Sequence, residues 1–455
     1  MRTFREPSKE IPTRDTDVVI AGGGTAGVIA ALASARNGAR TTLIESKGYV
    51  GGTAVEGGTA LHSFYNLYQA FDVEKKQLVK GIPQELIDRL IAAGGCSGHA
   101  EMSVGYDYDA VATVIDTEIY KLVAFEMLAE AGVEVLVNTL LADTIMDNST
   151  IQGVLTESHT GREAILAKSF VDCTGYGDLA ARAGAEYVEL NDHPVANSVG
   201  MGGVNIDCYY SYLQSLGAVS QRAEGLRSEK PDQIVRVDAD WNKLPQDFLA
   251  AAHEIGMSFV TTTLYDDSFL FIKLNYKMDT SPTDRDAAAL AELELRKRQQ
   301  QAVGLFQKFV PGCENAYITR TSPSLNIRRG RTILCDYDIT LEDVVEGRHF
   351  EDDILAYGFH DEAPRIQVKN GGSYGIPYRA LLAKDVTNLY CAGMIITTDW
   401  HAHMSTRNTV SCMGQGQAAG TAAALCSAQH CSSRALAYDD LKLALLKDGV
   451  VFVSN

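Results

Sequence analysis

The sequence lacks the cysteine spacings that metal centres and disulfide frameworks require. Its 9 cysteines are scattered from Cys96 to Cys431, contain no Cys-x-x-Cys pair and are odd in number. This pattern favours reduced thiols in a cytoplasmic protein over a disulfide scaffold, a zinc site or an iron–sulfur relay. We therefore predict no metal site.

Long basic runs are absent as well. The chain carries 58 acidic and 40 basic residues, a net charge of −18, and its most basic segment is Arg328-Arg329-Gly330-Arg331. A nucleic-acid-binding surface needs clustered lysines and arginines to replace the counterions of the phosphates. The sequence therefore predicts no nucleic-acid partner, and it argues against an anionic membrane surface.

Apolar segments of the kind that cross or enter membranes are also lacking. Residues 1–14 are polar, so we expect no signal peptide. One charge-free stretch, residues 18–35, is interrupted by glycines at 22–24 and 27 and is interpreted as strand, turn and helix. We find no internal repeats or low-complexity linker, and a length of 455 residues predicts two to four domain-sized units.

What is present begins with a β-α-β pattern. Residues 17–21 predict a strand, 25–37 a helix and 40–45 a second strand, and the first turn carries a GxGxxG motif at 22–27. Its glycines permit a tight turn and close approach of backbone to a pyrophosphate, and Glu45 can accept hydrogen bonds from ribose hydroxyls. The predicted binding residues of this unit are Gly22, Gly24, Thr25, Ala26, Gly27, Glu45 and Ser46.

Later segments favour FAD over NAD. Gly51-Gly52-Thr53 lies in a glycine-rich loop, 48–58, that suits a cofactor running on past its pyrophosphate. A strand at 388–393 and a small-residue helix at 408–428 would supply a second helix N-terminus for the negative charge of reduced flavin. Between the glycine-rich loop and this C-terminal unit we predict helices at 82–94, 109–131 and 284–309, a strand at 132–138, and hairpin strands at 151–157 and 164–172.

Several ordered segments carry a family resemblance. They are 20–27, 50–53, KGIPQEL at 80–86, DCTGYGD at 172–178, SLNIRRGR at 324–331, YGIPYR at 374–379, and 388–420. On these segments the chain resembles the FAD-dependent oxidoreductases of the glutathione-reductase-like superfamily. It is most similar to a bacterial family distantly related to fumarate reductase flavoproteins. The resemblance covers about residues 15–428.

The resemblance implies further FAD contacts and a noncovalent cofactor. The additional binding residues are Gly51, Gly52, Thr53, Gly57, Gly58, Leu141, Thr174, Gly175, Asp178, Gly393, Asn408 and Thr409. Covalent relatives place a histidine near the double glycine, where this chain has Gly51-Gly52, although His62 follows shortly after. Tyr176, Met394, Arg329 and Thr332 depart from the family pattern, so the resemblance does not transfer a substrate.

The richest group of candidate catalytic residues is expected on a loop before the last small-residue helix. His401, His403 and Arg407 lie there, and an i, i+2 histidine pair on an extended loop points to opposite sides. We favour His403 for proton transfer and Arg407 for binding a carboxylate. The same segment is also compatible with a purely structural hydrogen-bonding role. Arg328 and Arg331 form a second set, for which anion binding and a structural bridge are equally compatible with the sequence.

We predict an α/β protein with a Rossmann-like FAD-binding domain and an inserted α+β cap or substrate domain. The expected segments are 1–60, 130–190 and 385–430 for the FAD domain, 61–129 as a helical excursion, 191–384 as the cap, and 431–455 as a C-terminal tail. The predicted activity moves a hydride between flavin N5 and a small polar substrate, a sugar or hydroxy acid. Alternatives are an enoate reductase of fumarate-reductase type and an electron-transfer subunit. The electron acceptor, and whether the chain forms a homo-oligomer, stay open.

Overall fold

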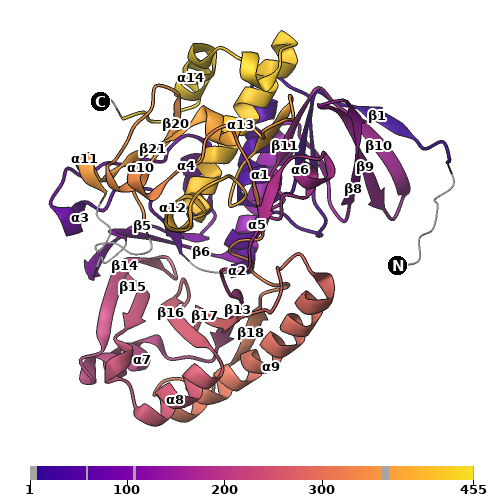
Figure 1. Ribbon diagram of the computed structural model, residues 1–455. Coiled ribbons are helices and arrows are strands. Elements are labelled where there is room, and N and C mark those ends of the chain that lie inside the picture. Colours follow the sequence, from indigo (N-terminus) through magenta and orange to yellow (C-terminus); the bar gives the residue numbers. More distant parts are fainter. Residues whose placement is uncertain (1–7, 58–59, 106–108, 361–367, 454–455) are drawn as a thin grey trace.

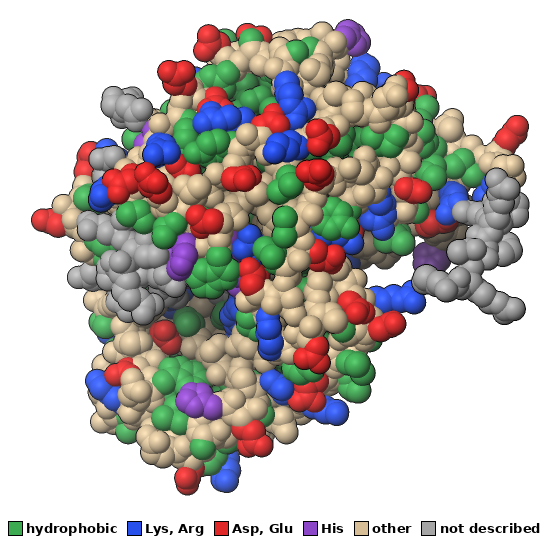
Figure 2. Space-filling view, in the orientation of Figure 1, with side chains coloured by type: hydrophobic (Ala, Val, Ile, Leu, Met, Phe, Trp, Pro, Cys, Tyr) green, Lys and Arg blue, Asp and Glu red, His purple; other side chains and the backbone are tan. Residues whose placement is uncertain are grey.

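The computed structural model describes residues 8–57, 60–105, 109–360 and 368–453. Two lobes are visible in Figure 1, an upper one containing the chain's two ends and a lower one containing residues from the middle of the chain. On the face shown in Figure 2, lysines and arginines are interspersed with aspartates and glutamates, and the surface is hollowed between the lobes. Among the described residues, no helix combines the length and the apolar character that crossing a membrane requires.

The upper lobe is built around a five-stranded parallel sheet with the order β22-β11-β2-β3-β7. Its strands are β2 (Val18–Ala21), β3 (Thr41–Ile44), β7 (Glu134–Leu136), β11 (Ser169–Asp172) and β22 (Leu389–Cys391). Four of them are buried at every residue, and this burial explains their apolar composition. The predicted Rossmann-like β-α-β unit is therefore confirmed.

A smaller sheet flanks the parallel one. Its order is β1-β10-β9-β8, and its strands are β1 (Thr13–Asp15), β8 (Leu140–Asp147), β9 (Thr150–Ser158) and β10 (Gly161–Leu166). The predicted hairpin is present as β9 and β10. The single strand predicted at 164–172 is wrong, because β10 ends at Leu166 and a new strand, β11, joins the parallel sheet.

The lower lobe is organised by a nine-stranded antiparallel sheet with the order β18-β13-β17-β16-β15-β14-β5-β6-β4. The strands are β4 (Leu61–His62), β5 (Cys96–Val104), β6 (Val111–Ile115), β13 (Val195–Gly202), β14 (Val219–Arg227), β15 (Lys230–Ala239), β16 (Met257–Thr262), β17 (Ser268–Tyr276) and β18 (Tyr317–Thr321). Helices α7 (Ile206–Ser215), α8 (Gln246–Glu254) and α9 (Arg285–Phe309) accompany it. The predicted charged helix is confirmed as α9, which Asp284 caps.

Residues 61–129 were expected to be helical and are only partly so. Helices α4 (Ile82–Ala92) and α5 (Thr117–Glu130) are present, but three strands, β4 to β6, extend the nine-stranded sheet from this region. The predicted helix at 109–131 fails in its first part. The segment VATVI forms β6, and the helix begins only where the Asp116 side chain accepts hydrogen bonds from two backbone N–H groups.

Two expectations for loops are corrected, and the C-terminal tail contains a helix. A short helix, α2 (Thr53–Gly57), interrupts the glycine-rich loop, and α12 (Trp400–Thr406) replaces the loop predicted around His401 and His403. The C-terminal tail contains α14 (Tyr438–Lys447), which buries Leu441 and Leu445 in the same core as the parallel sheet.

The remaining helices are α1 (Thr25–Arg36), α3 (Tyr68–Phe71), α6 (Asp178–Arg182), α10 (Leu341–Val345), α11 (Lys369–Gly372) and α13 (Thr409–Gln429), with short 3-10 turns at Trp241–Lys243, Tyr378–Leu381 and Ser433–Ala435. The remaining strands are β12 (Tyr187–Glu189), β19 (Arg331–Ile333), β20 (Asp353–Tyr357) and β21 (Tyr374–Pro377).

Candidate functional site

Helices α1 and α13 pack side by side in the upper lobe with almost no space between their backbones. A Cβ added at Gly416 would lie 2.2 Å from the Ala26 carbonyl oxygen, and one at Gly420 would lie 2.0 Å from that of Ala30. Both contacts advance in the same direction, so the helices run parallel. Since α13 starts seven residues before Gly416 and α1 starts one before Ala26, α13 extends about 9 Å further at its N-terminus.

Two helix N-termini therefore open at different depths of one site. Neither N-cap residue, Gly24 for α1 or Asn408 for α13, caps its helix with a side-chain hydrogen bond. Each N-terminus carries roughly half a positive charge. The buried Gln415 side chain fixes the second one, because it accepts a hydrogen bond from Gly393 N at 2.8 Å and donates one to the Thr406 carbonyl at 2.9 Å.

The glycine motif forms the cradle at the first helix. Gly22 has a φ of +92°, and a Cβ there would lie 2.6 Å from the Cys173 carbonyl oxygen, so only glycine allows β2 and β11 to end this close together. A Cβ on Gly27 would lie 1.8 Å from the Gly22 carbonyl oxygen. Gly24 and Gly52 meet backbone to backbone, because a Cβ on Gly52 would lie 2.8 Å from the Gly24 Cα.

Carboxylates organise the two loops beside this cradle. Glu45 accepts hydrogen bonds from Gly23 N at 2.7 Å and from Lys47 N at 2.8 Å. The fully buried Asp172 accepts three, from the backbone and hydroxyl of Thr174 and from Ala180 N. Burial raises the pKa of Asp172, and these hydrogen bonds oppose the increase by favouring the charged form.

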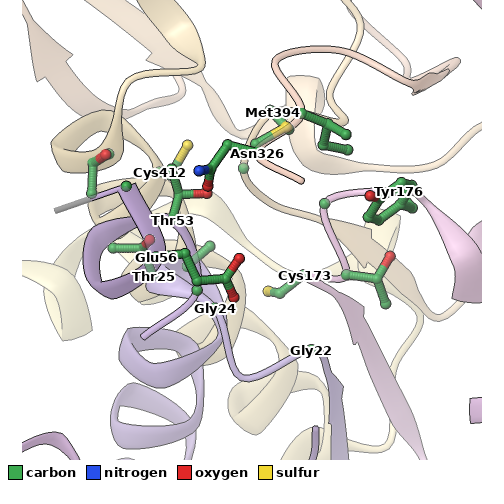
Figure 3. Close-up of a pocket in the computed structure, with 18 of the residues that line it drawn as sticks. Gly22, Gly24, Thr25, Thr53, Glu56, Cys173, Tyr176, Asn326, Met394 and Cys412 are labelled. Atoms are coloured by element: carbon green, nitrogen blue, oxygen red, sulfur yellow. The ribbon is translucent and has the colours of Figure 1, made fainter. Parts of the chain in front are cut away.

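The cradle opens into a cavity of about 590 Å³, within the usual range for small-molecule sites. Figure 3 places Gly22 at one side of the cavity. At the other side lie Asn326, from the loop between β18 and β19, and Met394, from the segment after β22. The predicted cofactor residues that line the cavity are Gly22, Gly24, Thr25, Ala26, Glu45, Ser46, Gly52, Thr53, Gly57, Leu141, Thr174, Gly175, Asp178, Gly393, Asn408 and Thr409.

Three predicted cofactor residues are not described as lining the cavity. Gly27 packs α1 against Gly22, as above. Gly51 has a φ of +113° and lies against Val55 and Tyr120, so its role is in the turn. Gly58 lies outside the described residues.

The histidines predicted for catalysis do not face the cavity. His403 is 1% exposed, its Nε2 donates to the Arg328 carbonyl at 2.8 Å, and it is not among the lining residues. Burial lowers the pKa of His403 well below its usual range, and the charges of Arg407 and Arg329 lower it further. His401 is exposed and also lies outside the lining. The two histidines do diverge, but they do so because residues two apart on α12 point to different faces.

The three arginines predicted around the active site, together with their neighbour Arg329, divide into two pairs. Arg328 and Arg407 line the cavity. Both lie close to His193, whose pKa is lowered first by burial and also by these two charges, against the opposing effect of Asp192. Arg331 instead bridges to Asp178 at 2.8 Å, and Arg329 is buried and paired with Asp192 at 3.1 Å. Of the two alternatives for Arg331, the geometry favours the structural bridge.

Sequence reasoning did not single out the residues that the sheet of the cap contributes. Ala196, Ser198 and Lys273 lie on one face of the cap sheet, since Lys273 pairs directly with Ser198 across β17 and β13, and all three line the cavity. Glu56, on α2, is buried there and bonds to Lys47, Tyr49 and Ser324. The alternating pattern of β13 and β17 was the available signal for the cap residues. None of the described residues forms a cluster suited to a metal ion.

These features define a class of protein. A parallel sheet with a glycine cradle, a cavity lined at two helix N-termini that are offset by about 9 Å along the helix axes, and an acidic residue after the second strand fit a dinucleotide that carries a flavin. The chain belongs to the FAD-dependent oxidoreductase family, whose model matches residues 17–445. It is an enzyme, and its cofactor is FAD.

Individual relatives are more distant. The chain is 26% identical over 185 residues to a thiamine thiazole synthase from Aeropyrum pernix, covering 38% of this chain and 58% of that one. It is 41% identical over 71 residues to a mitochondrial dihydrolipoyl dehydrogenase from Arabidopsis thaliana, covering 14% of each. The chain thus spans little more than half of the first curated relative and a small part of the second. A geranylgeranyl bacteriochlorophyll reductase-like structure from Thermoplasma acidophilum matches at a TM-score of 0.47 and 14% identity, covering 96% of this chain and 82% of that one.

Proposed function

We propose that this FAD-dependent oxidoreductase oxidises a small anionic molecule, a hydroxy acid in preference to an uncharged sugar. The observation that carries the proposal is that Arg328, Arg407 and Lys273, from three separate segments, line the same cavity. Arginine binds carboxylates through two parallel hydrogen bonds, which fixes the position of the bound molecule as well as its charge. A neutral sugar would gain little from three cations.

The roles of the chain's residues follow from their positions. Arg407 and Arg328 hold the substrate carboxylate, and Lys273 contributes positive charge from the cap side. The N-terminus of α13 favours negative charge on the ring system beside Gly393 and Thr409. When bound, FAD supplies N5 as the two-electron acceptor. The cap residues close the cavity from the side opposite the cradle and exclude water from it.

Reduction of an enoate, as in fumarate reductases, is the second candidate, because an enoate carries the same carboxylate. The two directions are distinguished by which compounds bleach the oxidised flavin and which reoxidise the reduced one. An electron-transfer subunit is the third candidate, and it predicts that electron transfer to an artificial acceptor is independent of Arg407.

The cofactor proposal, FAD held without a covalent bond, is tested by the visible spectrum of the purified protein before and after acid precipitation. We expect a flavin spectrum that moves into the supernatant and is identified as FAD. Colour that stays in the pellet would contradict noncovalent binding. A protein that neither contains FAD nor takes it up would contradict the cofactor assignment itself.

The carboxylate site is tested by Arg407→Ala, after hydroxy acids, sugars and enoates have been screened for bleaching or reoxidation of the flavin. Loss of a charged hydrogen-bonding partner is expected to lower kcat/KM by about 10- to 100-fold while FAD stays bound. Arg285→Ala is the matched control, because the Arg285 side chain is 93% exposed on α9. Turnover of a sugar with no effect of Arg407→Ala would contradict the proposal.

A further inference from the structure

A histidine–carboxylate pair lies at the edge of the nine-stranded sheet, and its histidine lines the cavity. His62 Nδ1 lies 2.9 Å from Asp109 Oδ2, and the two side chains are 18% and 5% exposed. The pairing of β4 with β6 sets His62 directly opposite Ala112 and so brings Asp109, just before β6, within reach. The other carboxylate oxygen of Asp109 accepts a hydrogen bond from Val111 N at 3.2 Å.

The surroundings of His62 fix its orientation. Its ring stacks on Phe359 with centroids 5.8 Å apart, and the Tyr357 hydroxyl donates to its carbonyl at 3.4 Å. Ser63, the next residue, has a φ of +66°, a conformation that non-glycine residues seldom adopt and that is enriched at functional sites. His62 lines the cavity, whereas Asp109 does not. The ring nitrogen on the side away from Asp109 is therefore Nε2.

The strand that carries His62 also contacts α13, whose N-terminus opens into the same cavity. His62 shares this cavity with Gly57, Ala60 and Thr409. His403, which sequence reasoning favoured for proton transfer, is not among the lining residues, since it is buried and bonded to a carbonyl.

We propose that His62 is the catalytic acid/base of the oxidoreductase and that Asp109 is its positioning residue, an inference that rests on the proposed function. In the oxidation of an alcohol, the O–H bond breaks and its proton passes to His62 Nε2, while the C=O bond forms. The hydrogen of the C–H bond leaves with two electrons to the oxidant, bound FAD. In the reverse reaction, reduction, protonated His62 donates the proton to the substrate, at the oxygen of a carbonyl or at the carbon of a C=C bond. Asp109 holds the proton on Nδ1, so that Nε2 presents its lone pair.

The tautomer of His62 tests the pair without turnover. In ¹⁵N-histidine-labelled protein, with and without FAD, neutral His62 is expected as the Nδ1–H form. Asp109→Ala should convert it towards the Nε2–H form, while His159, exposed on a β-turn, keeps its signals. An Nε2–H form in the wild-type protein would overturn the proposal, because such a nitrogen cannot accept the proton.

Turnover provides the second readout, with a compound found by flavin bleaching. His62→Gln is expected to keep its FAD spectrum and its KM and to lose kcat by about 10²- to 10⁴-fold. Added imidazole should partly restore kcat in His62→Ala, and Asp109→Asn should lose less than His62→Gln. His159→Gln should behave as wild type. Full kcat in His62→Gln would overturn the proposal. If no compound bleaches the flavin, the proposed function fails, and the tautomer measurement still decides the pair.

Discussion

At the scale of single residues, the Asp17 carboxylate joins three strands at the amino-terminal edge of the parallel sheet. It accepts hydrogen bonds from Arg40, just before β3, at 3.0 and 3.1 Å and from Lys168, just before β11, at 3.1 Å. The Arg40 side chain, through its hydrogen bond, is the main cause that lowers the pKa of Asp17 from 3.8 to about 2. The charged carboxylate is therefore more favourable in the folded protein than in the unfolded chain.

This residue gives a pH-dependent prediction. A depressed folded-state pKa contributes stability that is fully present above pH 4 and is lost as the pH falls towards 2. Asp17→Asn should therefore lower the urea midpoint at pH 7, and its difference from the wild type should disappear near pH 2. Asp286→Asn is the control, since this side chain is 88% exposed on α9. An Asp17→Asn difference that is equal at both pH values would contradict the explanation.

At the scale of elements, the parallel contact of α1 and α13 sets the spacing of the two helix N-termini. A side chain at Gly416 would collide with backbone, which cannot rotate away as a side chain can. Gly416→Ala is therefore expected to lower the free energy of unfolding by about 2–3 kcal/mol and to weaken FAD binding, because the helices must separate. Urea unfolding and FAD titration of the apoprotein measure the two effects.

The control for Gly416→Ala is Gly304→Ala. Gly304 also lies inside a helix, α9, but a Cβ there would meet nothing within 4 Å. The ordinary preference of helices for alanine should then stabilise the protein by about 0.5–1 kcal/mol. Destabilisation by both substitutions would show that the helix contact is not the cause.

The elements also show why only part of the fold could be predicted. The β-α-β unit was predictable because a strand, a glycine turn and a helix follow one another within residues 17–45 and each has its own periodicity. Strands β4 to β6 were missed although they pair with one another, β5 with β6 and β6 with β4. What joins them to the cap is the pairing of β5 with β14, which is distant in the sequence, and nothing in the segment 96–104 itself indicates that partner. The His62–Asp109 pair depends on the same strands, so the sequence indicated His62 but not the carboxylate that orients it.

At the scale of the whole molecule, the cap is fastened to the FAD-binding lobe through α2. Arg320, on β18, donates to the carbonyls of Val55 at 2.6 Å and Glu56 at 3.0 Å, and to the Thr117 hydroxyl at 2.9 Å. The Ser322 hydroxyl adds a bond to the Glu56 carbonyl at 2.9 Å. Because α2 carries part of the cavity lining, the same contacts that join the lobes also shape the site.

Arg320→Met should uncouple the two lobes. It removes the Arg320 donor from the carbonyls of Val55 and Glu56, of which Glu56 keeps the Ser322 hydroxyl, and we expect this loss to cost about 1–3 kcal/mol and to weaken FAD binding. The chain contains 2 tryptophans, Trp241 in the cap and Trp400 on α12, so the single-tryptophan variants Trp400→Phe and Trp241→Phe report on one lobe each. Their urea transitions should coincide in the otherwise wild-type protein and separate when Arg320→Met is added, with Arg285→Met as the exposed control. Coinciding transitions and unchanged FAD affinity in Arg320→Met would mean that the remaining contacts suffice to hold the cap, and the fastening role of Arg320 would be wrong.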